Sequence, residues 1–108
     1  MPTVDELGRE ELARLAALHS PAELARVQAE VATRRAVDAK GHYDLLAGDS
    51  IAAARAAKAA LGADDFDRLM DRAKRFHGAA QIAFRAYARA RMKADRLRRE
   101  ADKLTRTA

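Results

Sequence analysis

The sequence contains no cysteine and no tryptophan, only two prolines and five glycines, and aromatic residues make up just 5% of it. The absence of cysteine excludes disulfide bonds, thiolate nucleophiles and cysteine-based zinc sites. The scarcity of proline and glycine leaves few positions at which a helix would have to end. A sequence with so few breaks predicts long helices, and its core must be built from small side chains.

Long apolar runs are also missing. No uninterrupted apolar stretch approaches the roughly 20 residues that a membrane-spanning helix needs. The first residues, MPTVDELGREEL, are acidic and polar and do not resemble the apolar region of a signal peptide. We therefore expect no membrane association and a cytoplasmic location, in a bacterial or phage-infected cell.

What the sequence does contain is alanine and charge. Hydrophobic residues make up 49% of the chain and are mostly alanine, the strongest helix former and a residue that buries little area. Charged residues make up 34%, a proportion typical of long exposed helices. We predict an all-α protein. Its 108 residues suit a single helical domain covering 1–108.

The clearest helix boundary is the sequence HSPAEL. Here Ser20 is placed as an N-cap and Pro21 as the first helical residue, and Glu23, three positions after the cap, completes a capping box. A short helix over about 4–18, with leucines on one side, is predicted to precede this boundary. The boundary itself predicts the start of a second helix, over about 21–61.

A second boundary follows at LGADD. Gly62 is suited to end the second helix, and Asp64 to cap a third helix over about 64–105. The second helix carries Gly41 and Gly48, so the alternative is a kink or a break at one of them. The apolar pattern keeps its phase across both glycines, which favours a continuous helix.

Two apolar series run through the second and third helices, alternating steps of three and four residues. The average step, about 3.5 residues, is that of helices packed along a coiled-coil seam. The first seam comprises Ala22, Ala25, Ala29, Ala32, Ala36, Ala39, Tyr43, Leu46, Ser50, Ala53, Ala57 and Ala60. The second seam comprises Phe66, Leu69, Ala73, Phe76, Ala80, Ala83, Tyr87, Ala90, Ala94, Leu97, Ala101 and Leu104.

Two helices of nearly equal length joined by a tight turn predict a long antiparallel, coiled-coil-like helical hairpin. In this register Tyr43 faces Ala83, and the short N-terminal helix docks beside the hairpin as a third helix. A hairpin cannot bury Ile51, Ile82 and Phe84, which lie off the seams. We therefore predict self-association at these residues, most simply as a homodimer that forms a helical bundle. The alternative is that alanine on an exposed face needs no partner.

Constellations typical of enzymes are absent from the sequence. It has no glycine-rich phosphate loop, no HExxH and no Gly-x-Ser-x-Gly. In the predicted hairpin His42 and His77 lie too far apart along the helices to share a metal, and His19 suits the end of a helix. No Glu stands three residues before any histidine, as bundle metal sites require. We expect no enzymatic activity, catalytic residue, cofactor, metal or small-molecule substrate.

Positive charge is concentrated in the C-terminal part of the chain. Residues 1–60 hold eight basic and nine acidic side chains, whereas 61–108 hold thirteen basic and seven acidic ones. The stretch 84–106, FRAYARARMKADRLRREADKLTR, has nine Lys or Arg against three acids. One row within it alternates in sign and predicts a self-neutralising solvated face: Arg91, Asp95, Arg98, Asp102 and Arg106.

A second row in this stretch contains no acid, lies two positions after the seam residues and spans about 31 Å of helix. We call it the basic row; it comprises Arg85, Arg89, Arg96, Arg99, Lys103 and Arg106, with Met92 between them. Outer coiled-coil positions are usually charged, but they normally mix signs, because like charges at this spacing repel by a few tenths of a kcal/mol per pair. A bound anion would relieve this repulsion.

Nucleic acid is the commonest anion of this length, and the excess of arginine suits phosphate binding. No aromatic residue lies on the basic row, so stacking of single-stranded bases is not indicated. The first hypothesis is a non-enzymatic accessory or architectural subunit that binds nucleic-acid phosphates with low sequence specificity. The alternative is a structural or adaptor protein, in a phage, secretion or scaffold assembly, whose basic helix docks on an acidic protein.

Overall fold

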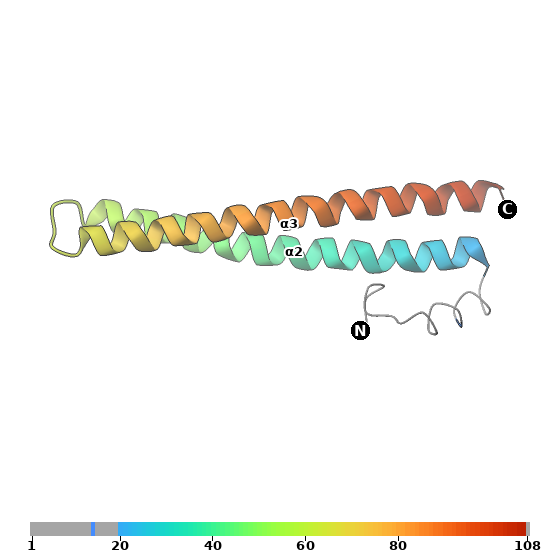
Figure 1. Ribbon diagram of the computed structural model, residues 1–108, viewed down its shortest axis with the longest axis horizontal. Helices are drawn as coiled ribbons and strands as arrows, with labels where there is room; N and C mark the ends of the chain where they lie inside the picture. The colour runs from blue at the N-terminus through green and yellow to red at the C-terminus, as the bar shows by residue number, and fades with distance from the viewer. Residues whose placement is uncertain (1–13, 15–19, 108) are drawn as a thin grey trace. The chain divides into compact units, whose positions relative to one another are not determined.

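The computed structural model describes Arg14 and residues 20–107. This part of the chain is all-α and contains two long helices, α2 (Pro21–Ala59) and α3 (Phe66–Thr107), joined by a turn (Figure 1). No strand occurs within these residues. The predicted all-α helical hairpin is thus confirmed at this level, whereas the predicted helix over 4–18 lies outside the described residues except for Arg14.

The helix α2 begins at the predicted N-cap, Ser20. The backbone N–H of Glu23 donates a hydrogen bond to Oγ of Ser20 over 3.2 Å. The N–H of Leu24 donates to the carbonyl of Ser20 over 3.0 Å, which is the first bond of the helix. The Ser20 hydroxyl therefore satisfies an N–H that the first helical turn would otherwise leave without a partner.

The turn between the helices differs from the sequence prediction by one residue. The carbonyl of Asp65 accepts the first bond of α3, from the N–H of Leu69 over 3.0 Å, so Asp65 takes the N-cap position that was predicted for Asp64. The N–H of Phe66 donates to the carbonyl of Ala63 over 3.2 Å, and both aspartates lie within the turn that this bond closes.

Gly62 is the residue that reverses the chain. Its φ of +85° is the one positive φ found in the described part of the chain. L-amino acids with a Cβ rarely adopt this conformation.

Replacing Gly62 with alanine is expected to lower the free energy of unfolding by about 1 kcal/mol, because the strain of a left-handed alanine exceeds its gain in chain entropy. Urea denaturation followed by circular dichroism measures the difference. Open space surrounds the position, so any loss reports backbone strain and not a steric clash. An alanine variant as stable as the parent would contradict this account.

The helix α2 runs without interruption from Pro21 to Ala59, through both Gly41 and Gly48. Both glycines are exposed, and a Cβ at either would meet no neighbouring atom. A glycine in a helix interior costs about 1 kcal/mol relative to alanine.

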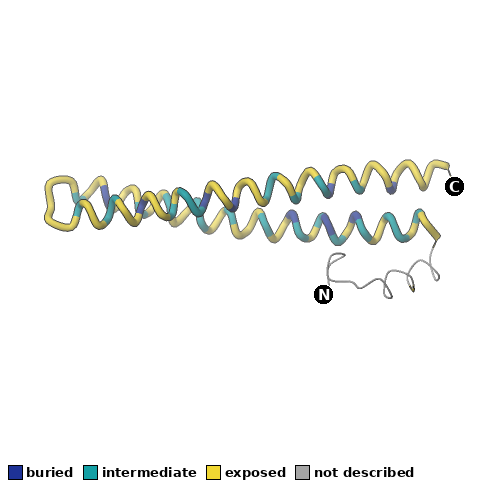
Figure 2. Tube along the Cα trace, in the orientation of Figure 1, coloured by how far each residue is buried: buried dark blue, intermediate teal, exposed yellow. Residues whose placement is uncertain are grey.

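Burial follows the two predicted seams. Every seam member is buried or half-buried except Leu104, whose side chain near the end of α3 is 39% exposed. Figure 2 shows such residues recurring along both helices. All of the buried core residues are alanines: Ala29, Ala32, Ala36, Ala57, Ala73, Ala80, Ala83, Ala94 and Ala101. Alanine seams let helix axes approach closely, but each residue removes little apolar area from water.

The contacts of the chain group into two compact units. In unit 1, built around 20–37 and 88–107, Ala94 of α3 packs with Ala32 and Ala36 of α2, flanked by Ala90 and Leu97. Unit 2 covers 38–87 and includes the turn.

The aromatic contact of unit 2 joins its two helix segments. The ring of Tyr43 meets that of Phe84 edge-on, with centroids 5.3 Å apart. The predicted register placed Ala83 opposite Tyr43, one residue away from the observed partner.

Candidate nucleic-acid interface

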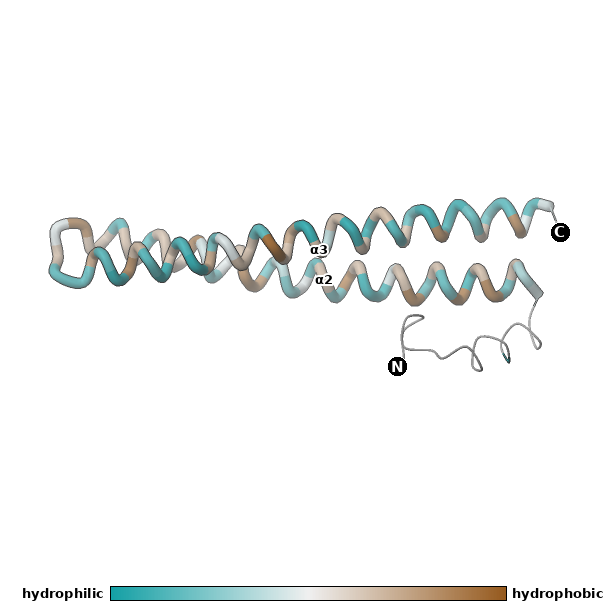
Figure 3. Tube along the Cα trace, viewed as in Figure 1, coloured by the Kyte–Doolittle hydropathy of each residue, from teal (hydrophilic) through white to brown (hydrophobic). Residues whose placement is uncertain are grey.

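All six residues of the basic row lie on α3, and all are exposed. Arg89, Arg96, Arg99, Lys103 and Arg106 belong to unit 1, and Arg85 belongs to unit 2. In unit 1 the row extends along about 26 Å of helix. Figure 3 shows that the C-terminal part of α3 is largely hydrophilic.

The outward direction of the row in unit 1 follows from the packing of the opposite side of α3. Ala94, only 2% exposed, packs against α2 together with Ala90 and Leu97. Successive helical residues are separated by about 100°, so a residue two positions after a seam residue lies on the far side of the helix. Arg96 and Arg99 stand in this relation to Ala94 and Leu97. The alanine seam therefore turns the row toward solvent.

Within residues 20–107 no side chain of the basic row forms an ion pair with a carboxylate. The ion pairs found there include Lys40 with Asp44, 3.4 Å apart, and Arg68 with Asp65, 3.5 Å apart, but none involves a side chain of the row. An exposed row of one sign whose side chains form no ion pairs favours the approach of anions. Met92, 71% exposed, is the uncharged member of the row.

The neighbouring row, predicted to alternate in sign and to neutralise itself, is arranged differently. Arg98 directs its guanidinium across to α2, where Nε and Nη2 donate to Oγ1 of Thr33 over 3.3 and 3.1 Å. Within residues 20–107 neither Asp95 nor Asp102 forms an ion pair with it. The Thr33 hydroxyl donates its own proton to the carbonyl of Ala29 over 2.8 Å, so its lone pairs face the arginine. Arg98 thus joins the two helix segments of unit 1.

A groove in unit 1 lies beside this contact and has mixed charge. It measures about 530 Å³ and is lined by Arg26, Ala29, Glu30, Thr33, Arg34, Arg98, Ala101 and Asp102. Carboxylates from both helices would repel a phosphate at close range. The basic row is therefore the more favourable place on unit 1 for a polyanion.

The residues predicted to mediate self-association lie in unit 2. The exposed fractions of Ile51, Ile82 and Phe84 are 55%, 66% and 51%. Phe84 differs from the other two because its ring packs against Tyr43 within the chain, a contact that the sequence pattern did not predict. Phe84 and Ile51 also line an open hollow of about 510 Å³ together with Tyr43 and Ala47.

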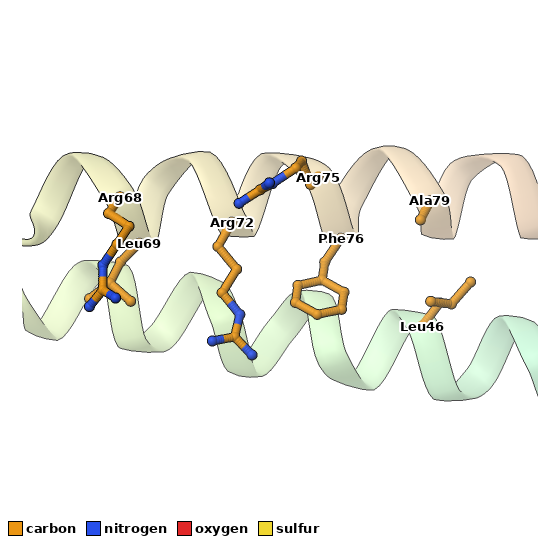
Figure 4. Close-up of a pocket in the computed structure, with 7 residues that line it drawn as sticks. All are labelled: Leu46, Arg68, Leu69, Arg72, Arg75, Phe76 and Ala79. Atoms are coloured by element: carbon orange, nitrogen blue, oxygen red, sulfur yellow. The ribbon is translucent and has the colours of Figure 1, made fainter.

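A cluster of arginines in unit 2 was not predicted from the sequence. It consists of Arg68, Arg72 and Arg75 and lines an apolar groove (Figure 4). The signal was present: two of these arginines directly precede the seam residues Leu69 and Phe76, at the flank of the hairpin. Residues 61–83 carry no net charge, however, because four acidic side chains accompany the four basic ones.

The described residues contain no group of His, Cys, Asp or Glu arranged to hold a metal ion. In the same part of the chain no helix is long and apolar enough to cross a membrane. No family model, no curated protein and no solved structure matches this sequence.

Proposed function

We propose that this protein is a non-enzymatic nucleic-acid-binding protein that contacts the phosphate backbone through the basic row of α3. The observation that carries the proposal is an exposed row of one sign whose side chains form no ion pair among residues 20–107. Like charges at helical spacing destabilise the free protein by a few tenths of a kcal/mol per pair. Phosphates placed along the row would remove this repulsion and release condensed counterions.

The chemistry of the row indicates how it binds. Arginine dominates it, and a guanidinium donates paired hydrogen bonds to phosphate oxygens. The row includes no aromatic side chain, so the proposed contacts are with the backbone and carry little sequence information. A protein of this kind suits an accessory or architectural role within a larger machinery, such as one that serves a plasmid, a phage or genome defence, in the cytoplasm.

Self-association is the second part of the proposal. Ile51, Ile82 and Phe84 place exposed apolar area in unit 2, and a homodimer would bury it in a helical bundle. A dimer would also present two basic rows to one polyanion, which raises the overall affinity without any new contact. The helix predicted over 4–18 would then complete a three-helix chain.

Binding of a labelled DNA duplex of about 30 base pairs tests the first part, and salt dependence gives the sharpest readout. If all six residues of the row meet phosphates, the logarithm of the binding constant falls with the logarithm of salt concentration with a slope of about −5. The affinity then falls about 1,000-fold between about 50 and about 200 mM salt. Fluorescence anisotropy over this range measures the slope.

Two outcomes of this titration would overturn the proposal. One is the absence of any binding at low salt with micromolar protein. The other is binding whose strength is insensitive to salt, because phosphate contacts without counterion release are not expected. The adaptor hypothesis, in which the same row docks on an acidic protein, would then be the one to pursue.

A further inference from the structure

Unit 2 contains an apolar groove bordered by three arginines. Its volume is about 590 Å³, and it is lined by Leu46 of α2 and by Arg68, Leu69, Arg72, Arg75, Phe76 and Ala79 of α3. Figure 4 shows Leu69 and Phe76 directed from α3 toward α2, with Leu46 directed back toward α3. The lining includes positive and apolar groups but no carboxylate.

The apolar floor of the groove is only partly covered. Leu46, Leu69 and Phe76 are all half-buried. They belong to the seams of two helices, and two helices alone cannot enclose side chains of this size. A third helix laid along the groove would complete their burial, at about 25 cal/mol for each Å² of apolar surface removed from water.

The border of the groove determines the charge of such a helix. Arg68, Arg72 and Arg75, which we call the groove arginines, are exposed and follow one another at steps of four and three residues. The guanidinium of Arg72 lies 5.6 Å from the centroid of the Phe76 ring, and this cation–π contact holds it beside the floor. Arg68 pairs with Asp65, but the two side chains are 77% and 50% exposed, and such pairs are weak.

An adjoining hollow shares Leu69, Arg72 and Phe76 with the groove and extends it toward the turn. Its further lining comes from α2 and consists of small alanines and Asp49. Asp49 is the one carboxylate that lines this adjoining hollow, whereas the lining of the groove itself contains none.

We propose that this groove binds an acidic amphipathic helix of a partner protein. From Leu69 to Ala79 the apolar floor extends over about 15 Å, which corresponds to about three helical turns. The partner helix would place leucine-like side chains on the floor. Carboxylates at positions i, i+4 and i+7 beside that apolar stripe would meet the groove arginines with the same spacing.

Other occupants fit the groove less well. A nucleic-acid backbone would pair with the arginines but would leave the apolar side chains of Leu46 and Leu69 uncovered. A second copy bound through Ile51 and Phe84 would use a different hollow, because no residue lines both. The inference goes beyond the proposed nucleic-acid function and stands on different residues.

The test uses two synthetic, fluorescein-labelled peptides of about 20 residues, long enough to form an isolated helix in part. Both carry leucine at heptad core positions; one has glutamate at the flanking i, i+4 and i+7 positions, and the other has lysine there. In the groove variant, Arg68, Arg72 and Arg75 are all replaced by glutamate. In the row variant, Arg96, Arg99 and Lys103 are replaced by glutamate, so both variants change the net charge equally.

Fluorescence anisotropy with the full chain is expected to show saturable binding of the acidic peptide. The groove variant should weaken this binding by at least about 20-fold and the row variant by less than about threefold, because only the first reverses charges at the site. The lysine peptide should bind the groove variant better than the parent. This rescue would exclude misfolding as the cause of the loss, and circular dichroism checks helix content directly.

Three outcomes would overturn the proposal. Equal losses in both variants would show non-specific attraction to a basic protein. Equal binding of both peptides to the parent would show that the arginines do not select charge. A change in the mass of the protein alone on reversal of the groove arginines would assign the groove to self-association. Binding of the DNA duplex is also measured on the groove variant. Because the duplex is expected to contact the basic row and the peptide to contact the groove, the two measurements separate a failure of the groove proposal from a failure of the proposed nucleic-acid function.

Discussion

Replacing Arg96, Arg99 and Lys103 with glutamate is expected to weaken duplex binding by at least about 100-fold at low salt. Each substitution removes a phosphate contact and adds a charge that repels the polyanion. All three side chains are exposed and make no ion pair within residues 20–107. Their reversal therefore changes the surface potential and leaves the alanine seam of unit 1 untouched.

Electrophoretic mobility shift or anisotropy with a labelled duplex measures the loss, and circular dichroism measures helix content. The matched control is the groove variant, which has the same change of net charge on the same helix and should retain most of the affinity. The corresponding alanine variant should lower the salt slope by about 3, one for each lost phosphate contact. Comparable losses in the row and groove variants would mean that total charge, and not the basic row, determines binding.

Replacing Ile82 with glutamate is expected to convert the proposed dimer to a monomer, raising the dimer dissociation constant by at least about 100-fold. A carboxylate that is buried in an interface without a partner costs several kcal/mol. Ile82 is 66% exposed in the single chain, so the substitution should leave the monomer nearly as stable as before. Light scattering over a range of protein concentrations measures the mass.

Leu45→Glu is the matched control for Ile82→Glu. Leu45 is 72% exposed, lies in the same unit and is not among the residues predicted at the interface. Phe84→Glu should also dissociate the dimer, but it removes the ring contact with Tyr43 as well, so its effect on the monomer is larger. A parent protein that remains a monomer at high concentration would contradict the prediction, as would equal dissociation by Leu45→Glu.

The local features of the fold were predictable from the residues because each depends on near neighbours. Ser20 caps α2 because a hydroxyl three residues before an N–H reaches it. Gly62 reverses the chain because it alone among the turn residues lacks a Cβ. The boundary of α3 was misplaced by one residue because LGADD offers two adjacent aspartates; in the structure the turn closed by the bond from Phe66 to Ala63 contains both, and α3 begins after the second.

The sequence predicted that the side chains of the basic row are exposed, but it did not predict the contacts of the residues beside the row. The basic row could be read from its distance to the seam, since a helix turns by a constant angle for each residue. The partner of Arg98 could not be predicted, because Thr33 lies 65 residues away in the chain. Since Asp95 and Asp102 are near Arg98 in the sequence, a row of alternating charges was the simpler interpretation.

By itself, then, the sequence determined the periodic and local properties of this protein: its helices, the alanine seams, the cap at Ser20 and the residues on the outer side of α3. These properties need only the pitch of a helix and the stereochemistry of a few residues. Tertiary structure alone decided what lies at the flanks of the seams, where Arg98 meets Thr33, Tyr43 meets Phe84, and arginines border an apolar groove. Residues next to the seams lie at the border of the contact between two helices. A small shift or rotation of one helix against the other therefore decides whether such a side chain contacts a neighbour or water.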